Sequence, residues 1–394
     1  MTVMGAPVAS SAPAATPRGS AIQAAAARGI ASRPSLSAPT RALFTRRGWA
    51  AFVVALVVVT VVLPAANLAL PAGHPLHVPD WFVTLAGKIM CYAIVALAMD
   101  LIWGFAGILS LGHGLFFALG GYAMGMYLMR SIGREGVYAS DLPDFMVFLD
   151  WKAYPWYWSF TDHFWYAALL VVLVPGVLAF VFGWFAFRSR IKGVYFSIIT
   201  QALTYAFMLL FFRNDTGFGG NNGFTDFKRI LGFPIAAPET RATLFALTGL
   251  ALFGALLVGR FVVTSKLGRV LAAIRDAESR VMFCGYNPVH YKLFVWTLSA
   301  VMCGIAGALY VPQVGIINPG EMSPANSIEI AIWTAVGGRG TLVGGIVGAL
   351  LVNGAKSWFT VAFPEFWLFF LGFLFIAVTV FLPGGVVSLF RRRS

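Results

Sequence analysis

The stretch Phe164–Phe187 reads FWYAALLVVLVPGVLAFVFGWFAF, and its 24 residues include no charged side chain. A helix needs about 20 apolar residues to cross the hydrocarbon core of a bilayer. The apolar residues here are continuous rather than alternating, which favours a helix over a strand of a membrane barrel. We therefore predict a transmembrane helix over this stretch.

Similar apolar segments recur along the chain of 394 residues. Only 11% of the residues are charged, whereas soluble domains carry about 25%. We therefore expect an all-α protein, a polytopic transmembrane helical bundle over residues 48–390 with about ten membrane segments. The predicted segments are 48–70, 82–103, 113–130, 164–187, 191–212, 242–263, 291–312, 325–336, 341–360 and 366–389.

The eighth of these segments is too short to cross a bilayer. It has twelve residues, Ala325 to Val336, and then breaks at Gly337–Gly340, which reads GGRG. We predict a broken or half-length helix, either confined to these residues or extended backwards in distorted form through Glu321–Pro324. Non-helical backbone at membrane depth has to be buried in protein or line a watery cavity, so the break is a first indication of a pathway.

The net charge of +13 has a topological explanation. With a cytoplasmic N-terminus, the inside segments hold 18 Lys and Arg against 2 Asp and Glu, and the outside segments hold 7 against 11. An excess of basic residues in cytoplasmic loops is the positive-inside rule. It predicts that both termini are cytoplasmic and that the basic residues serve topology and membrane lipid, not nucleic acid.

The two ends of the chain differ in composition from the bundle. Residues 1–47 are rich in Ala, Ser and Pro and contain no acid, so we expect a disordered, basic cytoplasmic tail. An organellar transit peptide is the alternative for this composition. Residues 391–394 are expected to form a short basic cytoplasmic C-terminus.

Motifs that bind nucleotides or metals do not occur in the sequence. There is no G-x-x-x-x-G-K-[ST] and no H-E-x-x-H, and Cys91, Cys284 and Cys303 lack metal-ligand spacing. We therefore expect no cofactor, no metal and no enzymatic activity. The alternative is an intramembrane enzyme built on Ser110 and His113, one helical turn apart, where helix packing by small residues is the competing explanation.

The cytoplasmic loop 264–290 carries the pattern of an amphipathic helix. Leu267, Val270, Leu271 and Ile274 form one apolar stripe, and the CGYNP sequence that follows ends the helix. Such a helix either lies on lipid headgroups or docks into a groove of a soluble partner. The acidic residues among the basic ones, and the sharp end, favour a partner.

This loop resembles the coupling loop of ABC importer permeases, in which an EAA…G sequence seats against the ATPase subunit. Here Glu278 is followed by Ser-Arg, and Gly285 falls seven residues on rather than six. This looser version is similar to that of the branched-chain amino acid and amide importer permeases. GFAGILSLGHGLFFALGGYA (Gly104–Ala123) and AIRDAE…GYNPVHYKLFVWTLSAVMCGIAGALY also resemble that family, and the resemblance covers roughly 80–389.

The resemblance implies a permease subunit that transports its solute together with other proteins. Its expected partners are two cytoplasmic ATP-binding subunits, a second homologous permease subunit and an extracytoplasmic solute-binding protein. The implied location is the cytoplasmic membrane of a bacterium. The residues that would couple to the ATPases are Arg275, Asp276, Glu278 and Gly285.

Three segments resemble the urea importer permeases within that family. They are FLDWKAYPWYW (Phe148–Trp158), NDTGFGGNNGFTDF (Asn214–Phe227) and INPGEMSPANSIEIAIWTAVGGRGTLVGGIVGALLVNGAKSWF (Ile317–Phe359). The resemblance implies urea, or another short-chain amide, as the solute. A branched-chain amino acid permease and a passive urea channel are the alternatives.

A path for urea needs both hydrogen-bond donors and acceptors, because each bond lost to water costs about 1–3 kcal/mol if it is not replaced. Polar groups at membrane depth usually face a cavity or one another. Glu329 is expected to accept N–H groups of urea, with a structural Glu329–Lys356 ion pair as the alternative, while Lys88 and Asp100 are expected to snorkel. The predicted pathway residues are Gln201, Asn326, Glu329 and Asn353.

The segment Asn214–Phe227 contains no Leu, Ile or Val and cannot be a span. We expect a compact outside loop built on Gly and Asn turns. A more specific interpretation has its Phe residues wedging it onto the bundle, with Asn221 and Asn222 meeting the solute or the delivery protein. The outside loop 131–163 is then a companion docking surface, or alternatively an aromatic interfacial belt.

Overall fold

The computed structural model describes residues 44–71, 73–381 and 384–391. The predicted tail 1–47 and the predicted C-terminal segment 391–394 lie almost entirely outside the described residues. Both remain predictions.

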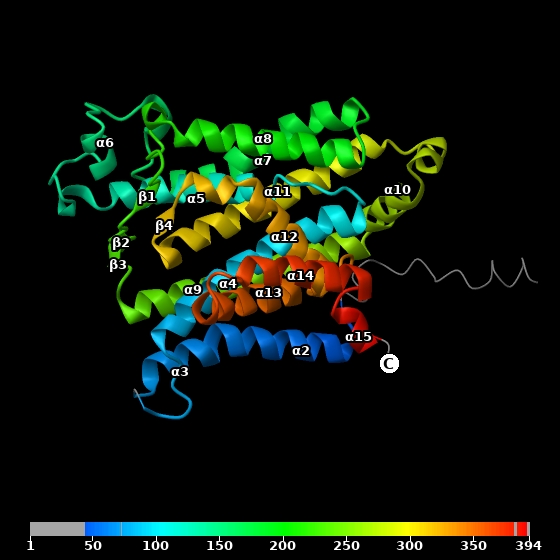
Figure 1. The fold of residues 1–394 in the computed structure, drawn as a ribbon, viewed down its shortest axis with the longest axis horizontal. Coiled ribbons are helices and arrows are strands. Elements are labelled where there is room, and N and C mark those ends of the chain that lie inside the picture. The colour runs from blue at the N-terminus through cyan, green and yellow to red at the C-terminus, as the bar shows by residue number, and fades with distance from the viewer. Residues whose placement is uncertain (1–43, 72, 382–383, 392–394) are drawn as a thin grey trace, which may run out of the picture. The chain divides into compact units, whose positions relative to one another are not determined.

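The described chain is mostly helical, as predicted (Figure 1). The longer helices are α2 (Arg46–Val57) and α3 (Leu63–Ala69), joined by the π-helical turn Val58–Val62; α4 (Asp80–Asp100), continued by the π-helical turn Leu101–Phe105; α5 (His113–Arg130); α7 (Phe164–Arg188); α8 (Val194–Phe212); α9 (Pro238–Thr264); α10 (Lys266–Phe283); α11 (Pro288–Val314); α12 (Pro324–Gly337); α13 (Val343–Ala362); and α14 (Trp367–Phe381). The short elements are α6 (Asp144–Phe148), α15 (Val387–Arg391), four 3₁₀ turns among the described residues (Gly133–Glu135, Trp156–Trp158, Asn214–Thr216, Pro319–Met322) and the strands β1 (Phe224–Thr225), β2 (Arg229–Ile230), β3 (Phe233–Pro234) and β4 (Ile316–Ile317).

Every one of the ten predicted segments contains a helix. Within the described residues, seven helical segments are long and apolar enough to cross a membrane: 46–69, 80–105, 164–188, 194–212, 238–264, 288–314 and 343–362. The other three predicted segments are the shorter helices α5, α12 and α14, of 18, 14 and 15 residues. The prediction of a polytopic helical membrane bundle is therefore confirmed.

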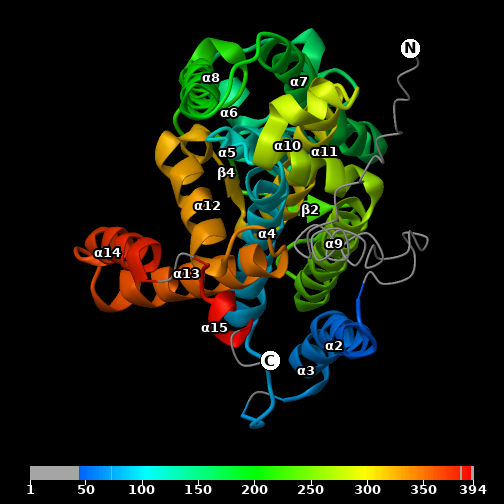
Figure 2. The ribbon, with the colours of Figure 1, turned by 90° about the vertical axis from the view of Figure 1, so that its right-hand side faces the viewer.

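The centre of the bundle is built around α4 and α11. α11 packs along α5, α7 and α4, and α4 also contacts α9, α12 and α13. Figure 2 shows α4 with α12 and α13 on one side and α9 and α11 on the other. All residues from Ala93 to Ile102 are buried, because α4 has neighbours on every side at that level. Glycines such as Gly120 of α5, which faces Gly304 of α11, allow the close backbone approach typical of membrane helices.

The predicted broken segment is α12 with the 3₁₀ turn Pro319–Met322 before it. Ser323 caps the helix, its Oγ accepting from Asn326 N at 3.3 Å, and Pro324 occupies the first turn, where a missing N–H is harmless. The helix stops at Gly338, whose φ of 117° suits glycine alone. Its 14 residues rise about 21 Å, less than the roughly 30 Å of a bilayer core.

Asp100 corrects one sequence-based expectation. We predicted a snorkelling side chain, but Asp100 is fully buried and its carboxylate accepts from the backbone N–H groups of Gly340, Thr341 (3.2 Å) and Leu342 (2.8 Å). These N–H groups belong to the break before α13. The ends of helices leave backbone N–H groups without intrahelical partners, and the buried Asp100 carboxylate supplies acceptors for three of them.

The loop Asn214–Phe227 is compact, as predicted, and its phenylalanines pack inwards. Phe218 stacks on Phe211 with ring centroids 3.8 Å apart, and Phe224 is fully buried. The strand β1 in this loop pairs antiparallel with β4, with Phe224 opposite Ile317. Asn221 and Asn222 are exposed and line a surface hollow of about 420 Å³ together with Tyr138 and Asp144. The loop therefore covers one end of the bundle, and α10 lies at the other (Figure 1).

Candidate functional site: a polar cavity beside the broken helix

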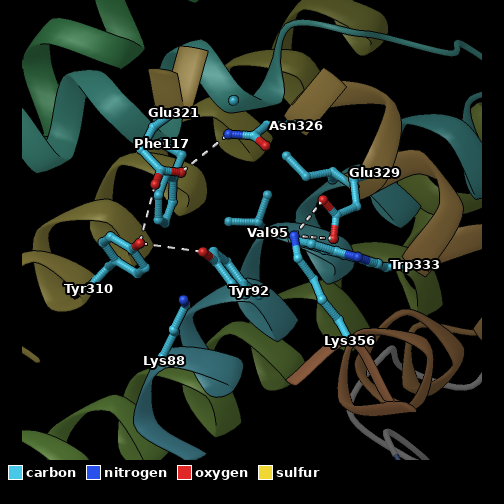
Figure 3. A pocket seen from close by; sticks show the side chains of 12 residues that line it. Lys88, Tyr92, Val95, Phe117, Tyr310, Glu321, Asn326, Glu329, Trp333 and Lys356 are labelled. Atoms are coloured by element: carbon cyan, nitrogen blue, oxygen red, sulfur yellow. Dashed lines mark hydrogen bonds and ion pairs between the residues drawn. The ribbon is translucent and has the colours of Figure 1, made fainter. Parts of the chain in front are cut away.

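A cavity of about 200 Å³ lies between α4 and α12, with α5, α11 and α13 completing its walls (Figure 3). Because a water molecule occupies about 30 Å³ in the liquid, the cavity is large enough for a small solute. Its lining is Lys88, Tyr92, Val95, Gly114, Phe117, Tyr310, Glu321, Asn326, Glu329, Ile330, Trp333 and Lys356.

One wall of the cavity is a chain of hydrogen bonds. Tyr92 Oη donates to Tyr310 Oη at 3.4 Å, and Tyr310 Oη donates to Glu321 Oε1 at 3.2 Å. Asn326 Nδ2 donates to Gly320 O at 3.1 Å and lies 3.5 Å from Glu321 Oε2. The 3₁₀ turn before α12 thus brings Glu321 to the hydroxyl of Tyr310 on α11, and this hydrogen bond fixes the orientation of the carboxylate.

The opposite wall is an ion pair. Lys356 Nζ of α13 donates to both carboxylate oxygens of Glu329 of α12, at 3.0 and 2.9 Å. The side chain of Glu329 is 8% exposed and that of Lys356 34%. The Glu329–Lys356 pair anticipated from the sequence therefore exists, and it lines the cavity as well.

Lys88 lines the same cavity as Glu321 and Glu329 but forms an ion pair with neither of them. Its ammonium lies 5.8 Å from the centroid of the Tyr92 ring. Within the described residues it forms no ion pair. It also lines a second cavity of about 500 Å³, near the beginnings of α4 and α9, together with Trp81, Arg241 and Gln313. We had expected Lys88 merely to snorkel; the structure places it in the lining of both cavities.

The four predicted pathway residues separate into two groups. Asn326 and Glu329 line the cavity, but Gln201 and Asn353 do not. Gln201 is half-buried on α8, and Asn353 is buried with its Nδ2 donating to Ala349 O at 3.0 Å. Sequence reasoning missed Tyr92, Tyr310 and Glu321 as lining residues. The acidic residue just before a predicted half-helix was the one available signal for them.

The amphipathic helix predicted in the cytoplasmic loop is α10. Leu271 and Ile274 of its apolar stripe are buried against the bundle, and the helix ends at Phe283, two residues before Gly285, whose φ is 84°. At Ala277 the backbone leaves the helical conformation (φ −157°, ψ 77°). A shallow groove of about 400 Å³ runs along its outer side, lined by residues that include Arg269, Ala273, Asp276, Ala277 and Arg280.

Three of the predicted coupling residues attach α10 to the bundle or to each other. Arg275 Nη1 donates to Gly104 O at 2.8 Å and its Nε donates to Asp276 Oδ1 at 3.0 Å. Glu278 accepts from Lys192 Nζ at 2.8 Å and from Lys292 Nζ at 2.6 Å. Partial burial alone would raise the pKa of the Glu278 carboxyl, but the hydrogen bonds from Lys192 and Lys292 outweigh it and lower that pKa below its usual value. Glu278 is therefore an anionic bridge between α10 and two neighbouring segments.

The two residues of the enzymatic alternative do not form a catalytic pair. His113 Nε2 lies 2.6 Å from Ser299 Oγ, and Ser110 Oγ accepts from Gly112 N at 3.1 Å. No hydrogen bond joins Ser110 to His113 in the described part of the chain, and both side chains are fully buried. Nor do the described residues contain a cluster of three or more His, Cys, Asp or Glu suited to a metal ion.

Comparisons with known proteins agree with this architecture. Residues 81–379 match the family described as branched-chain amino acid transport system / permease component. The high-affinity branched-chain amino acid transport system permease protein LivM of Salmonella typhimurium is 24% identical over 348 residues, covering 83% of this chain and 74% of LivM; the LivM protein of Escherichia coli is 23% identical with the same coverage. The ribose import permease protein RbsC of Escherichia coli is 25% identical over 203 residues, 48% of this chain and 62% of RbsC. No solved structure matches.

The fold is a multi-pass helical bundle with a polar cavity beside a broken helix. The chain belongs to the family of branched-chain amino acid transport permease components, a family of ABC-type importers. Permeases of this type work in general with ATPase and solute-binding partners.

Proposed function

We propose that this chain is the membrane-spanning subunit of an ABC importer that moves urea, or another short-chain amide, across the cytoplasmic membrane of a bacterium. The observation that carries the proposal is the cavity beside α12, whose walls present tyrosine hydroxyls, an amide, carboxylates and ammonium groups to one small space. A solute that leaves water needs replacements for both its donor and its acceptor bonds. Urea has one strong acceptor and two NH₂ groups, and this lining supplies partners for both.

The energy for transport is proposed to come from other subunits. Two ATP-binding subunits would bind on the cytoplasmic side, one of them on the groove along α10. A second homologous permease would complete the membrane part, and an extracytoplasmic protein would deliver the solute to the end covered by Asn214–Phe227. The contacts of Arg275 and Glu278 support this role, because they connect α10 to the turn that follows α4 and to α11, at the centre of the bundle. The chain itself would carry no nucleotide site and no enzymatic activity.

A branched-chain amino acid is the second candidate solute. Both LivM relatives carry that function in their names, and a charged cavity suits a zwitterion. The three segments that resemble urea importers, and polar groups on both walls of the cavity (Figure 3), favour the amide, because an aliphatic side chain gains most from an unbroken apolar wall.

Uptake in the bacterium that encodes the chain separates these solutes. We expect uptake of radiolabelled urea at low external concentration to be lost when this gene is deleted, and to be lost equally when the gene of its ATPase partner is deleted. Uptake of labelled leucine is the parallel measurement. Urea uptake that persists without the ATPase would identify a passive channel, and loss of leucine uptake alone would make the amino acid the solute.

A further inference from the structure

Glu321 differs from the other carboxylate of the cavity in its remaining hydrogen-bond capacity. Both oxygens of Glu329 are engaged by Lys356. Glu321, in contrast, accepts from one tyrosine hydroxyl, lies at the 3.5 Å limit from Asn326 Nδ2, and takes part in no ion pair in the described residues. A carboxylate offers about four acceptor positions, so Glu321 retains acceptor positions beside the cavity.

Lys88 is the complementary group. It is half-buried, has no carboxylate partner among the described residues, and lines both the inner cavity and the wider outer one. An ammonium carries three donors, and a buried charge without a partner is unfavourable. Lys88 and Glu321 lie on different elements, both line the inner cavity, and they do not pair with each other.

We propose that Lys88 and Glu321 are the residues that hold the solute inside the membrane: Lys88 donates to its carbonyl oxygen and Glu321 accepts from its N–H groups. This rests on the proposed function and assigns the contacts within it. The ligand class is a small neutral amide with its acceptor at one end and its donors at the other. Glu329 then serves to position Lys356 and does not hold the solute. Trp333 adds a buried indole N–H that has no partner within the described residues.

Urea uptake by the complete importer in cells, compared between variants, tests the proposal. Glu321→Ala and Lys88→Met should each raise the KM for urea about 10- to 100-fold, the value of one hydrogen bond to a charged group, at equal amounts of protein in the membrane. Glu321→Gln keeps one acceptor oxygen, so its KM should rise less than that of Glu321→Ala. Matched controls are Glu365→Gln and Lys228→Met, two exposed residues that line neither cavity, which should leave uptake unchanged.

The KM separates the proposed contact from a structural role. A variant that only weakened the fold would lower the maximal rate and the protein level with an unchanged KM, and that result would overturn the proposal. A loss in Glu321→Gln as large as in Glu321→Ala would indicate a cationic amino group in place of an amide, and would overturn the assigned ligand class.

A binding measurement keeps the inference independent of urea transport. In a Cys284→Ser background, Asn326→Cys places a thiol in the cavity, while Cys91 and Cys303 are buried. Urea should slow alkylation of this thiol in the purified full-length chain, and the protection should vanish when Glu321→Ala is added. If urea protects the thiol but is not taken up, the proposed function is wrong and the site is not. If urea is taken up but gives no protection that depends on Glu321, the site alone is wrong.

Discussion

At the scale of single residues, the charged groups in the cavity have separate roles. Glu329 and Lys356 neutralise each other across α12 and α13, whereas Lys88 and Glu321 have no ionic partner among the described residues. An ion pair at this depth is strongly destabilised when one member is removed, because the other is left as an isolated charge. The Glu329–Lys356 pair therefore stabilises the attachment of the broken helix to α13.

The first prediction concerns this pair. Lys356→Met should lower the stability of the purified chain by about 3 kcal/mol, since Glu329 is left buried without its counter-charge. The double variant Glu329→Met/Lys356→Met should recover most of this loss. Thermal unfolding in one detergent, followed for the two single variants and the double variant, measures the coupling between the residues. If the effects of the single variants simply add, the pair makes no stabilising contribution of its own.

At the scale of elements, one set of contacts joins α10 to the cavity. Arg275 of α10 bonds Gly104 O in the π-helical turn that follows α4. Asp100, one turn earlier, holds the N–H groups of Gly340, Thr341 and Leu342 between α12 and α13. Since α12 and α13 carry Glu329 and Lys356, we expect a movement of α10 to be transmitted to the cavity wall through these hydrogen bonds.

Arg275→Met is therefore expected to separate ATP hydrolysis from transport in the assembled importer. Hydrolysis by the ATPase subunits should continue while uptake per ATP falls about tenfold, equivalent to 1.4 kcal/mol of lost coupling. Asp100→Asn breaks the next contact in the series and should act in the same direction. Lys266→Met, at an exposed residue of α10 that does not line the groove, is the matched control. Unchanged uptake per ATP in Arg275→Met would exclude this route.

At the scale of the whole molecule, the described bundle has two different ends. One carries α10 and the other the loop Asn214–Phe227 with α6 (Figure 1). The distribution of basic residues predicts that the α10 end faces the cytoplasm. On the proposed function, this orientation would place the ATPases at α10 and a delivery protein at the end that carries the loop Asn214–Phe227.

Cysteine labelling tests this orientation in the natural sequence. Cys284 is exposed beside the end of α10, whereas Cys91 and Cys303 are buried. A membrane-impermeant maleimide should leave the chain unlabelled in intact spheroplasts and should label it in inside-out vesicles. Trp156→Cys on a Cys284→Ser background, at a position 84% exposed in the opposite loop, should give the reverse pattern. Labelling of Cys284 in intact spheroplasts would show that the α10 end faces outwards and would contradict the predicted topology.

The sequence alone determined the elements of this protein. Long apolar runs can only be helices in lipid, and the twelve-residue segment before GGRG could only be a broken one. The amphipathic stripe of α10 was predictable from the local spacing of its apolar residues, and the compactness of Asn214–Phe227 was predictable from its Gly and Asn turn residues.

The tertiary structure alone decided which polar residues meet. Gln201 and Asn353 look like pathway residues in the sequence but lie outside the cavity, while Tyr92, Tyr310 and Glu321 come from three separate segments and share one wall. Asp100 bonds N–H groups about 240 residues further along the chain. Helix packing and the need to satisfy polar groups away from water determine such partners. Neither can be predicted from the local sequence.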